Sequence, residues 1–258
     1  MTSYHTKYPP HLCYNRLPLL ATIVYDVGYE GSGVVPQHSY PYRDTMVDGD
    51  VVFVKTDLLG WFLSNRSIGA RITLVTGVSD ITPTEEQCNQ ILVNPNIVRW
   101  IGCNIPVSHP KIRKVLIGVG EPERPNGNHE LLVDLHATRI PWYAKDTEIC
   151  IPFHGNTHES RTRMPTLPRL PFQEYMDAIS HHKFVVCMRG NGLDTHRFSE
   201  ILLMGSVPIV ETSPLDDLYS QFPCILVNSL DDIDTSSFVW DETKYQAFLN
   251  MFWLRRLL

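Results

Sequence analysis

Short hydrophobic runs alternate with amphipathic segments along most of the chain. The runs predict strands over residues 19–26, 50–56, 71–77, 97–104, 114–120, 148–154, 183–188, 207–211 and 224–228. The amphipathic segments predict helices over residues 57–65, 82–92, 129–139, 172–182, 195–205 and 241–258. Strands separated by helices are typical of βαβ units, so the pattern predicts an α/β fold built on parallel sheets.

One loop divides this pattern into two halves. The stretch GEPERPNGN, residues 120–128, continues neither a helix nor a strand, because Pro, Gly and Asn interrupt both. We therefore expect an N-terminal domain over residues 1–122 and a C-terminal domain over residues 123–258. The final helix would be able to pack back on the N-terminal domain. Residues 1–50 are rich in Pro, Tyr and Gly and predict only the strand at 19–26.

The stretch CMRGNGLDTHRFSEILLMGSVPIVE, residues 187–211, carries the clearest chemical pattern. It follows a predicted strand, turns through Gly190, Asn191 and Gly192, and enters the helix predicted over 195–205. Ligands of open parallel sheets bind beyond the carboxyl ends of the strands, and a helix N-terminus attracts phosphate. Glycines allow a tight turn and a close approach of the backbone. We expect this turn to hold a diphosphate.

Charged side chains surround the same helix start. Arg189 and Arg197 flank it, and each guanidinium is able to hold phosphate oxygens. Glu200 follows one turn later on the helix face that also carries His196. A carboxylate there is able to accept hydrogen bonds from a ribose diol, and Asp194 and His196 are further candidates for contacts to the nucleotide. Together these residues predict a ligand that carries phosphate.

Simpler interpretations exist for each of these features. Arg197 and Glu200 are spaced as an ordinary surface ion pair on a helix, and the glycines are compatible with a plain turn. The pattern from Gly190 to Glu211 also partly matches a dinucleotide fingerprint, although Thr195 replaces its third glycine. An NAD-dependent oxidoreductase therefore stays an alternative. No GK[ST] sequence follows, which excludes a Walker loop.

RGNGLDTHRFSEILLMGSVPIV resembles the nucleotide-sugar-binding block of exostosin-like glycosyltransferases. In the first half, VFVKTDLL, ITLVTGVSD, NPNIVRWIGCN and HPKIRKVLIGVG resemble that family's acceptor-side domain in order and style. The likeness spans roughly residues 50–230 and is greatest to compact stand-alone members, including those of large DNA viruses. It implies the GT-B architecture, in which two Rossmann-like domains face each other across a cleft.

The resemblance also implies an activity. Such an enzyme moves a sugar from a nucleoside diphosphate sugar, with UDP the family's favoured nucleotide, to a hydroxyl of a glycan acceptor, here as part of protein glycosylation by a viral protein. Glu200 would hold the ribose, as the family's pattern implies. Xylose, glucuronic acid, galactose and N-acetylglucosamine all stay open as the transferred sugar. A nucleotide- or glycan-binding module without catalysis is a second hypothesis.

Transfer to a hydroxyl requires a general base, and Asp80 is the best candidate. It follows the strand at 71–77, so it lies on a loop at a sheet edge, where a narrow and partly desolvated cleft would raise the pKa of its carboxyl. The alternative role is an Asx turn before ITPTEE. Arg161 is a third candidate for the diphosphate or else a solvated loop residue. One base without a covalent nucleophile predicts inversion at the anomeric carbon.

We expect no metal and no cofactor. No DxD sequence lies on a predicted strand-end loop, because DDIDTS at 231–236 is typical of a solvated helix start. His154 and His158 have the spacing of metal ligands on a helix, but Gly155 and Asn156 oppose a helix there. Arginines and a helix N-terminus would stabilise the departing diphosphate instead.

Composition narrows the class of protein further. The 258 residues are 43% hydrophobic and 19% charged with a net charge of −6, which is typical of a water-soluble protein and argues against nucleic acid as a partner. The six cysteines form no CxxC pair, which indicates buried free thiols and a cytoplasmic protein, in the host cytoplasm if viral. We expect neither a signal peptide nor a membrane span, since no run approaches the ~18 apolar residues a span needs.

Overall fold

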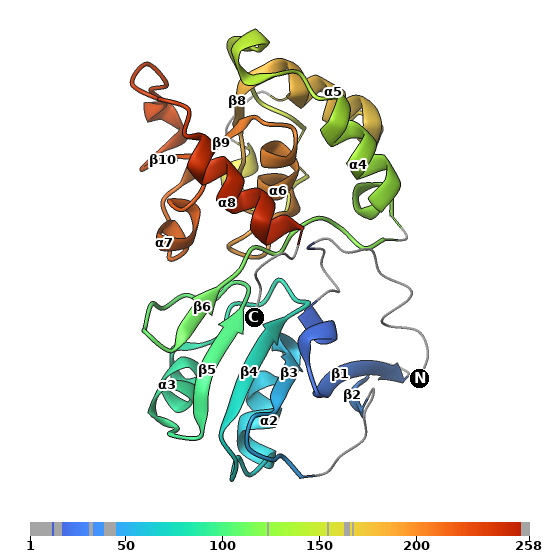
Figure 1. Ribbon diagram of the computed structural model, residues 1–258, viewed down its shortest axis with the longest axis vertical. Coiled ribbons are helices and arrows are strands. Elements are labelled where there is room, and N and C mark those ends of the chain that lie inside the picture. Colours follow the sequence, from blue (N-terminus) through green and yellow to red (C-terminus); the bar gives the residue numbers. More distant parts are fainter. Residues whose placement is uncertain are drawn as a thin grey trace.

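The structure, a computed structural model, describes Leu12 and residues 17–30, 33–38, 45–122, 124–153, 155–162, 166 and 168–253. Two sheets of parallel strands with helices around them form an α/β fold, which confirms the class that the hydrophobic pattern predicts (Figure 1). The calls that concern residues 1–11, 13–16, 39–44, His154 and 254–258 lie outside the described residues.

The N-terminal sheet has the order β2-β1-β3-β4-β5-β6. Its strands are β1 (Ile23–Glu30), β2 (Gly33–His38), β3 (Val51–Lys55), β4 (Ile72–Gly77), β5 (Ile97–Gly102) and β6 (Ile112–Lys114). All pairs are parallel except β1 with β2, which forms an antiparallel hairpin. Hairpin strand β2 was not predicted, because it contains Pro36. A proline cannot donate to the ladder and is tolerated at a sheet edge, where β2 lies.

Short helices connect the central strands. The 3-10 helix η2 (Thr56–Leu58) leads into α2 (Leu59–Asn65), and α3 (Glu85–Val93) follows β4. Helix α3 begins at Glu85 rather than at residue 82 because Thr84 forms a capping box with Gln87. The Thr84 hydroxyl accepts from Gln87 N at 3.2 Å, and Thr84 N donates to Gln87 Oε1 at 3.0 Å.

The strand predicted over residues 114–120 is wrong. Strand β6 ends at Lys114, and residues 115–119, the crossing segment, lead from one sheet towards the other. Val115 N still donates to Gly102 O of β5 at 3.0 Å, but the segment forms no strand of either sheet. Val115, Leu116, Ile117 and Val119 are buried because the chain passes between the two halves. Gly118 has a φ of +75°, and a Cβ on it would lie 2.2 Å from Leu12 O. The apolar run therefore reflects burial on both sides of a crossing segment.

The C-terminal sheet has the order β10-β9-β8-β7, and all its pairs are parallel. Its strands are β7 (Asp146–Cys150), β8 (His182–Val186), β9 (Val207–Glu211) and β10 (Ile225–Val227). Its helices are α4 (His129–Thr138), α5 (Phe172–His181), α6 (His196–Leu203), α7 (Asp216–Tyr219) and α8 (Glu242–Phe252). The other 3-10 helices are η1 (Leu17–Leu20), η3 (Pro125–Gly127), η4 (Trp142–Ala144), η5 (Glu159–Thr162) and η6 (Leu230–Asp232).

Helix α8 closes the C-terminal half and reaches the junction with the N-terminal half (Figure 1). It begins after Asp241, whose carboxylate accepts from Thr243 N and Lys244 N at 2.8 and 3.1 Å. It packs on α6, and at its end Phe252 O accepts a hydrogen bond from Leu12 N at 2.6 Å. The final helix thus belongs to the C-terminal layer and also contacts a residue from the N-terminal part of the chain.

The parallel strands follow chain order within each sheet. A doubly wound Rossmann sheet reverses its order at a switch point, where ligands bind. Neither sheet shows that reversal among the described strands. The loops that follow the strands instead meet one another. Asn104, after β5, accepts from Asp194 N, after β8, at 2.8 Å, so the carboxyl edges of the two sheets approach each other.

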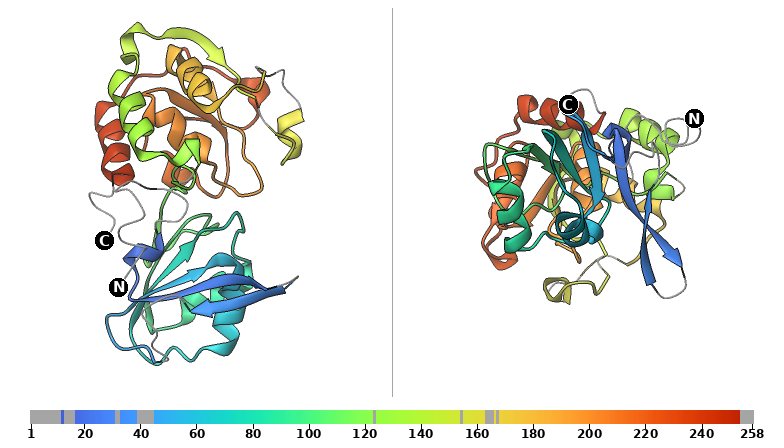
Figure 2. Two further views of the ribbon diagram at one scale, coloured as in Figure 1. Left: turned by 90° about the vertical axis from the view of Figure 1, so that its right-hand side faces the viewer. Right: turned by 90° about the horizontal axis from the view of Figure 1, so that it is seen from below.

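The two sheets with their helices lie one above the other along the long axis of the molecule (Figure 2), and buried apolar side chains of both halves meet between them. The largest core cluster contains residues from both, for example Phe53 and Ile101 together with Phe198 and Phe248. Two further clusters lie within one sheet each. Burial of apolar area on both sides of the crossing segment is the main force that holds the halves together.

The structure also bears on two expectations from composition, one about the cysteines and one about membrane-spanning helices. Of the five described cysteines, all free, Cys88, Cys103, Cys150 and Cys187 are buried, as predicted. Cys224 is only half-buried. Within the described part of the chain, no helix has both the length and the apolar character that a membrane crossing requires.

Candidate functional site

The start of α6 organises the candidate site. Thr195 is the N-cap of this helix in extended conformation, and its side chain makes no capping hydrogen bond. Helix α6 is buried from Phe198 to Leu203, so packing fixes its position. The first backbone N–H groups of this helix are not capped by the Thr195 side chain, and the helix itself is held firmly by packing. Such a helix N-terminus is suited to bind an anion.

The turn before α6 approaches protein rather than open space. A Cβ on Gly192 would lie 3.0 Å from both Asp80 O and Asn104 Nδ2, and one on Gly190 would lie 3.1 Å from Arg161 Nη2. The glycines therefore permit the close contact of this loop with other segments of the chain. This packing does not favour the prediction that Gly190 and Gly192 make room for a diphosphate.

Asp194 is committed to the fold, which corrects its expected role at the nucleotide. Its side chain is only 3% exposed. The carboxylate accepts from Ile117 N at 2.7 Å, Thr195 N at 2.8 Å and Tyr219 Oη at 3.0 Å. Burial raises the pKa of Asp194 to about 6, and these hydrogen bonds act in the opposite direction. A carboxylate with these contacts ties the crossing segment to the start of α6.

Arg161 is likewise occupied by the backbone. Its Nε donates to Arg189 O at 2.6 Å, its Nη2 to Met188 O at 3.2 Å and its Nη1 to Gly155 O at 3.4 Å. These bonds fasten the loop before η5 to the end of β8. The sequence left two roles open for Arg161, a contact to the diphosphate or a solvated side chain. The geometry favours neither role, because the guanidinium is bound to backbone carbonyls of the protein.

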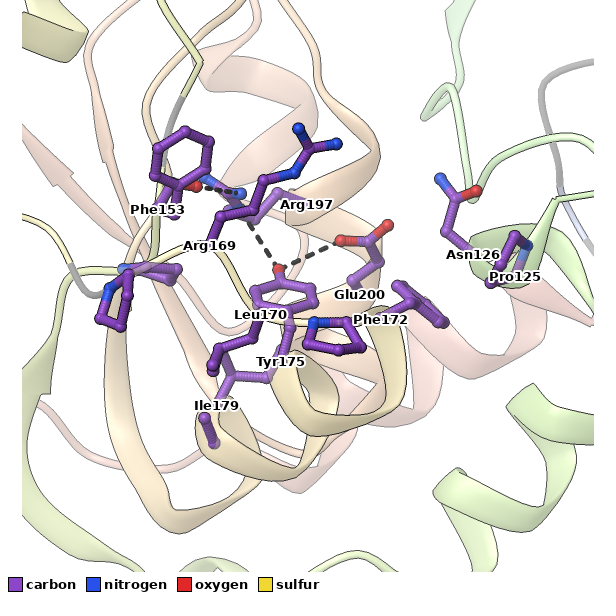
Figure 3. Close-up of a pocket in the computed structure, with 14 residues that line it drawn as sticks. Pro125, Asn126, Phe153, Arg169, Leu170, Phe172, Tyr175, Ile179, Arg197 and Glu200 are labelled. Atoms are coloured by element: carbon purple, nitrogen blue, oxygen red, sulfur yellow. Dashed lines mark hydrogen bonds between the residues drawn. The ribbon is translucent and has the colours of Figure 1, made fainter.

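Arg197 and Glu200 line a cavity of about 620 Å³ on the C-terminal half, which we name the Glu200 pocket (Figure 3). Its walls are mostly apolar and aromatic. Its lining comprises Pro125, Asn126, Pro152, Phe153, Pro168, Arg169, Leu170, Pro171, Phe172, Tyr175, Ala178, Ile179, Arg197 and Glu200. Apolar walls with a few convergent polar groups are typical of small-molecule sites.

A chain of hydrogen bonds connects the polar groups of this pocket (Figure 3). Arg197 Nε donates to Tyr175 Oη at 3.2 Å, and Tyr175 Oη donates to Glu200 Oε2 at 3.1 Å. Arg197 Nη2 donates to Phe153 O at 2.7 Å, and its guanidinium lies 5.4 Å from the centre of the Tyr175 ring. The three side chains are thereby held in fixed orientations before any ligand arrives.

Glu200 is a buried carboxylate beside a cavity. It is 6% exposed, and burial raises its pKa, whereas His196, Arg197 and hydrogen bonds from Tyr175 and Asn126 act in the opposite direction. Buried carboxylates with perturbed pKa values that face a pocket are frequent at functional sites. Its remaining acceptor capacity suits hydroxyl groups of a ligand.

A second, smaller cavity adjoins this one, because Asn126 lines both. We name it the junction pocket. Its volume is about 280 Å³, and it is lined by Asp80, Gly120, Glu121, Arg124, Asn126 and His196. Asp80 comes from the loop after β4 and His196 from the first position of α6, so both halves contribute. His196 Nδ1 lies 2.8 Å from Gly118 O, which fixes the imidazole against the crossing segment.

The structure corrects the environment expected for Asp80. The side chain is exposed rather than desolvated, and its Oδ2 accepts a hydrogen bond from Asn191 Nδ2 at 3.4 Å. Its place beside the start of α6 agrees with the expected position for a base. The narrow, dry surroundings that the sequence predicted for this carboxylate are not present in this structure.

Arg189 lines a different cavity from Arg197. It lines a third cavity of about 250 Å³ at the carboxyl ends of β8, β9 and β10, together with Thr195 and Glu211. The sequence prediction that Arg189 and Arg197 grip one diphosphate is therefore not supported by their placement, since the two side chains line different pockets.

Several lining residues of the Glu200 pocket had no signal in the sequence. Tyr175 belongs to α5, for which the sequence predicted only an amphipathic helix, and Phe153 follows β7 without a motif. Asn126 lies in the loop that marks the domain boundary. Arg169 is exposed, and no hydrogen bond or ion pair holds its guanidinium within the described residues.

Within the described residues, no group of three or more His, Cys, Asp or Glu side chains is placed to hold a metal ion. The expectation of a metal-independent reaction stays a prediction. His158 Nδ1 lies 2.9 Å from Ser160 Oγ, whereas His154 is outside the described residues.

No protein-family model matches the chain, and a search of curated proteins finds no match either. The chemical case therefore rests on the site. A pocket of about 620 Å³ with a fixed arginine, tyrosine and carboxylate adjoins a smaller pocket that is lined by an exposed aspartate from the other half of the molecule.

Proposed function

We propose that this protein is an inverting, metal-independent glycosyltransferase with the GT-B arrangement, which transfers a sugar from a nucleoside diphosphate sugar to a hydroxyl of a glycan. The observation that carries the proposal is the Glu200 pocket. Its aromatic and apolar walls suit a nucleobase, and the carboxylate of Glu200 suits the vicinal hydroxyls of a ribose.

The start of α6 supports a place for the diphosphate next to that nucleoside. Arg197 lines the Glu200 pocket and His196 the junction pocket, so a ligand that passes from one pocket to the other crosses the N-terminus of the helix. The positive end of the helix dipole and the Arg197 guanidinium would stabilise negative charge on the departing diphosphate.

In the proposed reaction the acceptor hydroxyl oxygen attacks the anomeric carbon while the bond from that carbon to the diphosphate oxygen breaks. Asp80 takes the proton of the hydroxyl, and the diphosphate leaves with the bonding electrons. One displacement inverts the anomeric configuration. Asp80 supports this role by its position, because it lines the pocket next to the start of α6 and belongs to the other half of the molecule.

The exposure of Asp80 favours a second candidate, a nucleotide-binding module without catalysis. The carboxylate of Asp80 is exposed to water, whereas catalytic groups act most strongly in a site from which water is excluded. The two candidates share the nucleotide site and differ only in turnover.

A transfer assay with the Asp80→Asn variant separates them. The protein is incubated with UDP or GDP sugars and a panel of oligosaccharides, and the release of nucleoside diphosphate is measured. We expect Asp80→Asn to lower turnover by at least about 100-fold, since general bases contribute that much, without a change in nucleotide affinity. Asp57→Asn, an exposed aspartate on η2, is the matched control and leaves turnover unchanged.

The other outcomes of the assay reject the base, the catalysis or the nucleotide site. Full turnover in the Asp80→Asn variant excludes Asp80 as the base. Nucleotide binding by the unmodified protein without transfer or hydrolysis establishes the binding module. No binding of UDP or GDP rejects both candidates.

A further inference from the structure

The cavity at the carboxyl ends of β8, β9 and β10 is lined by Arg189, a residue with an unsatisfied buried donor. We name this cavity the strand-edge pocket. The Nε atom of Arg189 is buried and has no hydrogen-bond partner among the described residues. Buried donors in folded proteins nearly always have a partner, so an orphaned one beside a cavity indicates a ligand or water that supplies the acceptor.

The other polar groups of this cavity define the ligand further. Glu211, the last residue of β9, and Asn228, just after β10, line it, and no hydrogen bond of either side chain occurs within the described residues. The hydroxyl-bearing Thr212 and Ser213 also line it. Loops at the carboxyl ends of parallel strands are where open α/β sheets bind their ligands.

The carboxylate of Glu211 argues against a phosphate in this pocket. An anion next to Glu211 would be repelled by it, and a cation would be repelled by Arg189. A hydroxyl group satisfies both residues, because it accepts from the Arg189 guanidinium and donates to the Glu211 carboxylate. Several such groups on one rigid ring are the defining feature of a sugar.

The position of the pocket connects it to the donor. Thr195 lines the strand-edge pocket, His196 the junction pocket and Arg197 the Glu200 pocket. These consecutive residues form the start of α6, so three cavities surround one helix N-terminus. A nucleoside diphosphate sugar has the same order of parts, with a diphosphate between a nucleoside and a sugar.

We propose that the strand-edge pocket binds the hydroxyl groups of the transferred sugar, with Arg189 as donor and Glu211 as acceptor. This assignment rests on the proposed function, and it moves Arg189 from the diphosphate to the sugar. Arg189 and Glu211 then determine which sugar is accepted, whereas Glu200 and Arg197 determine whether a nucleotide binds at all.

The test compares a nucleotide with its sugar conjugates by calorimetric titration. The probes are UDP and GDP, then UDP-xylose, UDP-glucuronic acid, UDP-galactose and UDP-N-acetylglucosamine, with GDP-mannose and GDP-fucose if GDP is the nucleotide that binds. We expect one conjugate to bind at least about tenfold more tightly than its nucleotide, as one or two well-made hydrogen bonds supply.

Two variants, one isosteric and one that removes the guanidinium, show which residues produce that gain in affinity. Glu211→Gln and Arg189→Gln are expected to reduce it at least about tenfold while the affinity for the nucleotide alone stays unchanged. Glu148→Gln, an exposed residue on β7 in the same sheet, is the matched control and changes neither affinity.

The outcomes separate this inference from the proposed function. The assignment of the strand-edge pocket is overturned if the sugar conjugate keeps its extra affinity over the nucleotide in both variants, or if no conjugate binds more tightly than its nucleotide. In either case, binding of the nucleotide itself still supports the proposed function. A loss of nucleotide affinity in Arg189→Gln overturns the assignment as well, because Arg189 would then act on the diphosphate. No nucleotide binding overturns both.

Discussion

Asp194 and Glu200 are buried carboxylates on either side of the first turn of α6, yet their surroundings differ. Asp194 accepts from donors on Ile117, Thr195 and Tyr219, and it lines none of the cavities described above. Glu200 accepts from Tyr175 and lines a large pocket. Burial raises the pKa of both carboxyls, so the pKa shift alone does not distinguish structure from function.

The two carboxylates differ in where their hydrogen-bond donors come from and in whether a cavity lies beside the carboxylate. The donors of Asp194 come from the crossing segment and from α7, so its carboxylate joins parts of the fold. The donor to Glu200, Tyr175, itself lines the cavity, so the carboxylate lies beside space that a ligand is able to fill. The predictions below test this contrast, from the largest expected effect to the smallest.

Asp194→Ala is expected to lower the free energy of unfolding by roughly 3 kcal/mol or more, since it leaves several buried donors without an acceptor. Chemical denaturation at pH 7 measures the change. A loss below about 1 kcal/mol would contradict the structural role of this carboxylate, because that is the worth of a single ordinary hydrogen bond.

The stability contributed by Asp194 should depend on pH. Its pKa in the folded state, about 6, lies above the ordinary value of 3.8, so the folded protein binds more protons than the unfolded chain between these values. The free energy of unfolding therefore falls as the pH rises from about 4 to about 6, by at most about 3 kcal/mol from this group.

Asp194→Asn removes this titration, so the difference in unfolding free energy between the unmodified protein and the variant isolates it. We expect that difference to shrink as the pH rises through the same interval. A difference that is constant between pH 4 and pH 6 would show that the pKa of Asp194 is not raised by folding.

A third carboxylate, Asp217, provides an exposed counterpart. It accepts from Lys114 Nζ at 2.6 Å across the junction of the two halves, and its side chain is 49% exposed. Lys114 Nζ keeps Ser108 Oγ and Pro214 O as partners when Asp217 is changed. Asp217→Asn is therefore expected to cost only about 1 kcal/mol, with a cost that decreases in high salt. A cost as large as that of Asp194→Ala would contradict this ranking.

Glu200→Gln should change stability least, by less than about 1 kcal/mol, because the amide keeps an acceptor for Tyr175 and no longer carries a buried charge. Thermal and chemical denaturation check this value. A large destabilisation would place Glu200 with Asp194 among the residues that hold the fold.

The sequence predicted the strands and helices well where their apolar pattern reflects one local cause. The strand at 207–211 has the predicted bounds, and α4 and α5 end one residue before the predicted positions. The apolar pattern wrongly predicted a strand at residues 115–119. A segment buried between two halves of a protein has the same run of apolar residues as a strand buried within a sheet. The pattern also missed β2, since Pro36 is allowed only by the edge position of that strand.

The site was predictable only in part. Glu200 and Arg197 share one helix, so their proximity follows from local spacing. The partners of Asp194 and Arg161 come from distant segments, among them Ile117, Tyr219 and the end of β8, and no local pattern reveals such contacts. Tyr175 was also missed, because an aromatic residue at helical spacing has the same pattern whether it packs in the core or lines a pocket.

The central claim is that the Glu200 pocket binds a nucleotide, and calorimetric titration with UDP, GDP and NAD in the presence of EDTA tests it most directly. The account predicts micromolar binding of UDP or GDP that falls at least about tenfold in Glu200→Gln and stays unchanged in the stability control Asp217→Asn. Binding of NAD alone, equal binding in Glu200→Gln, or no binding of any nucleotide would contradict it.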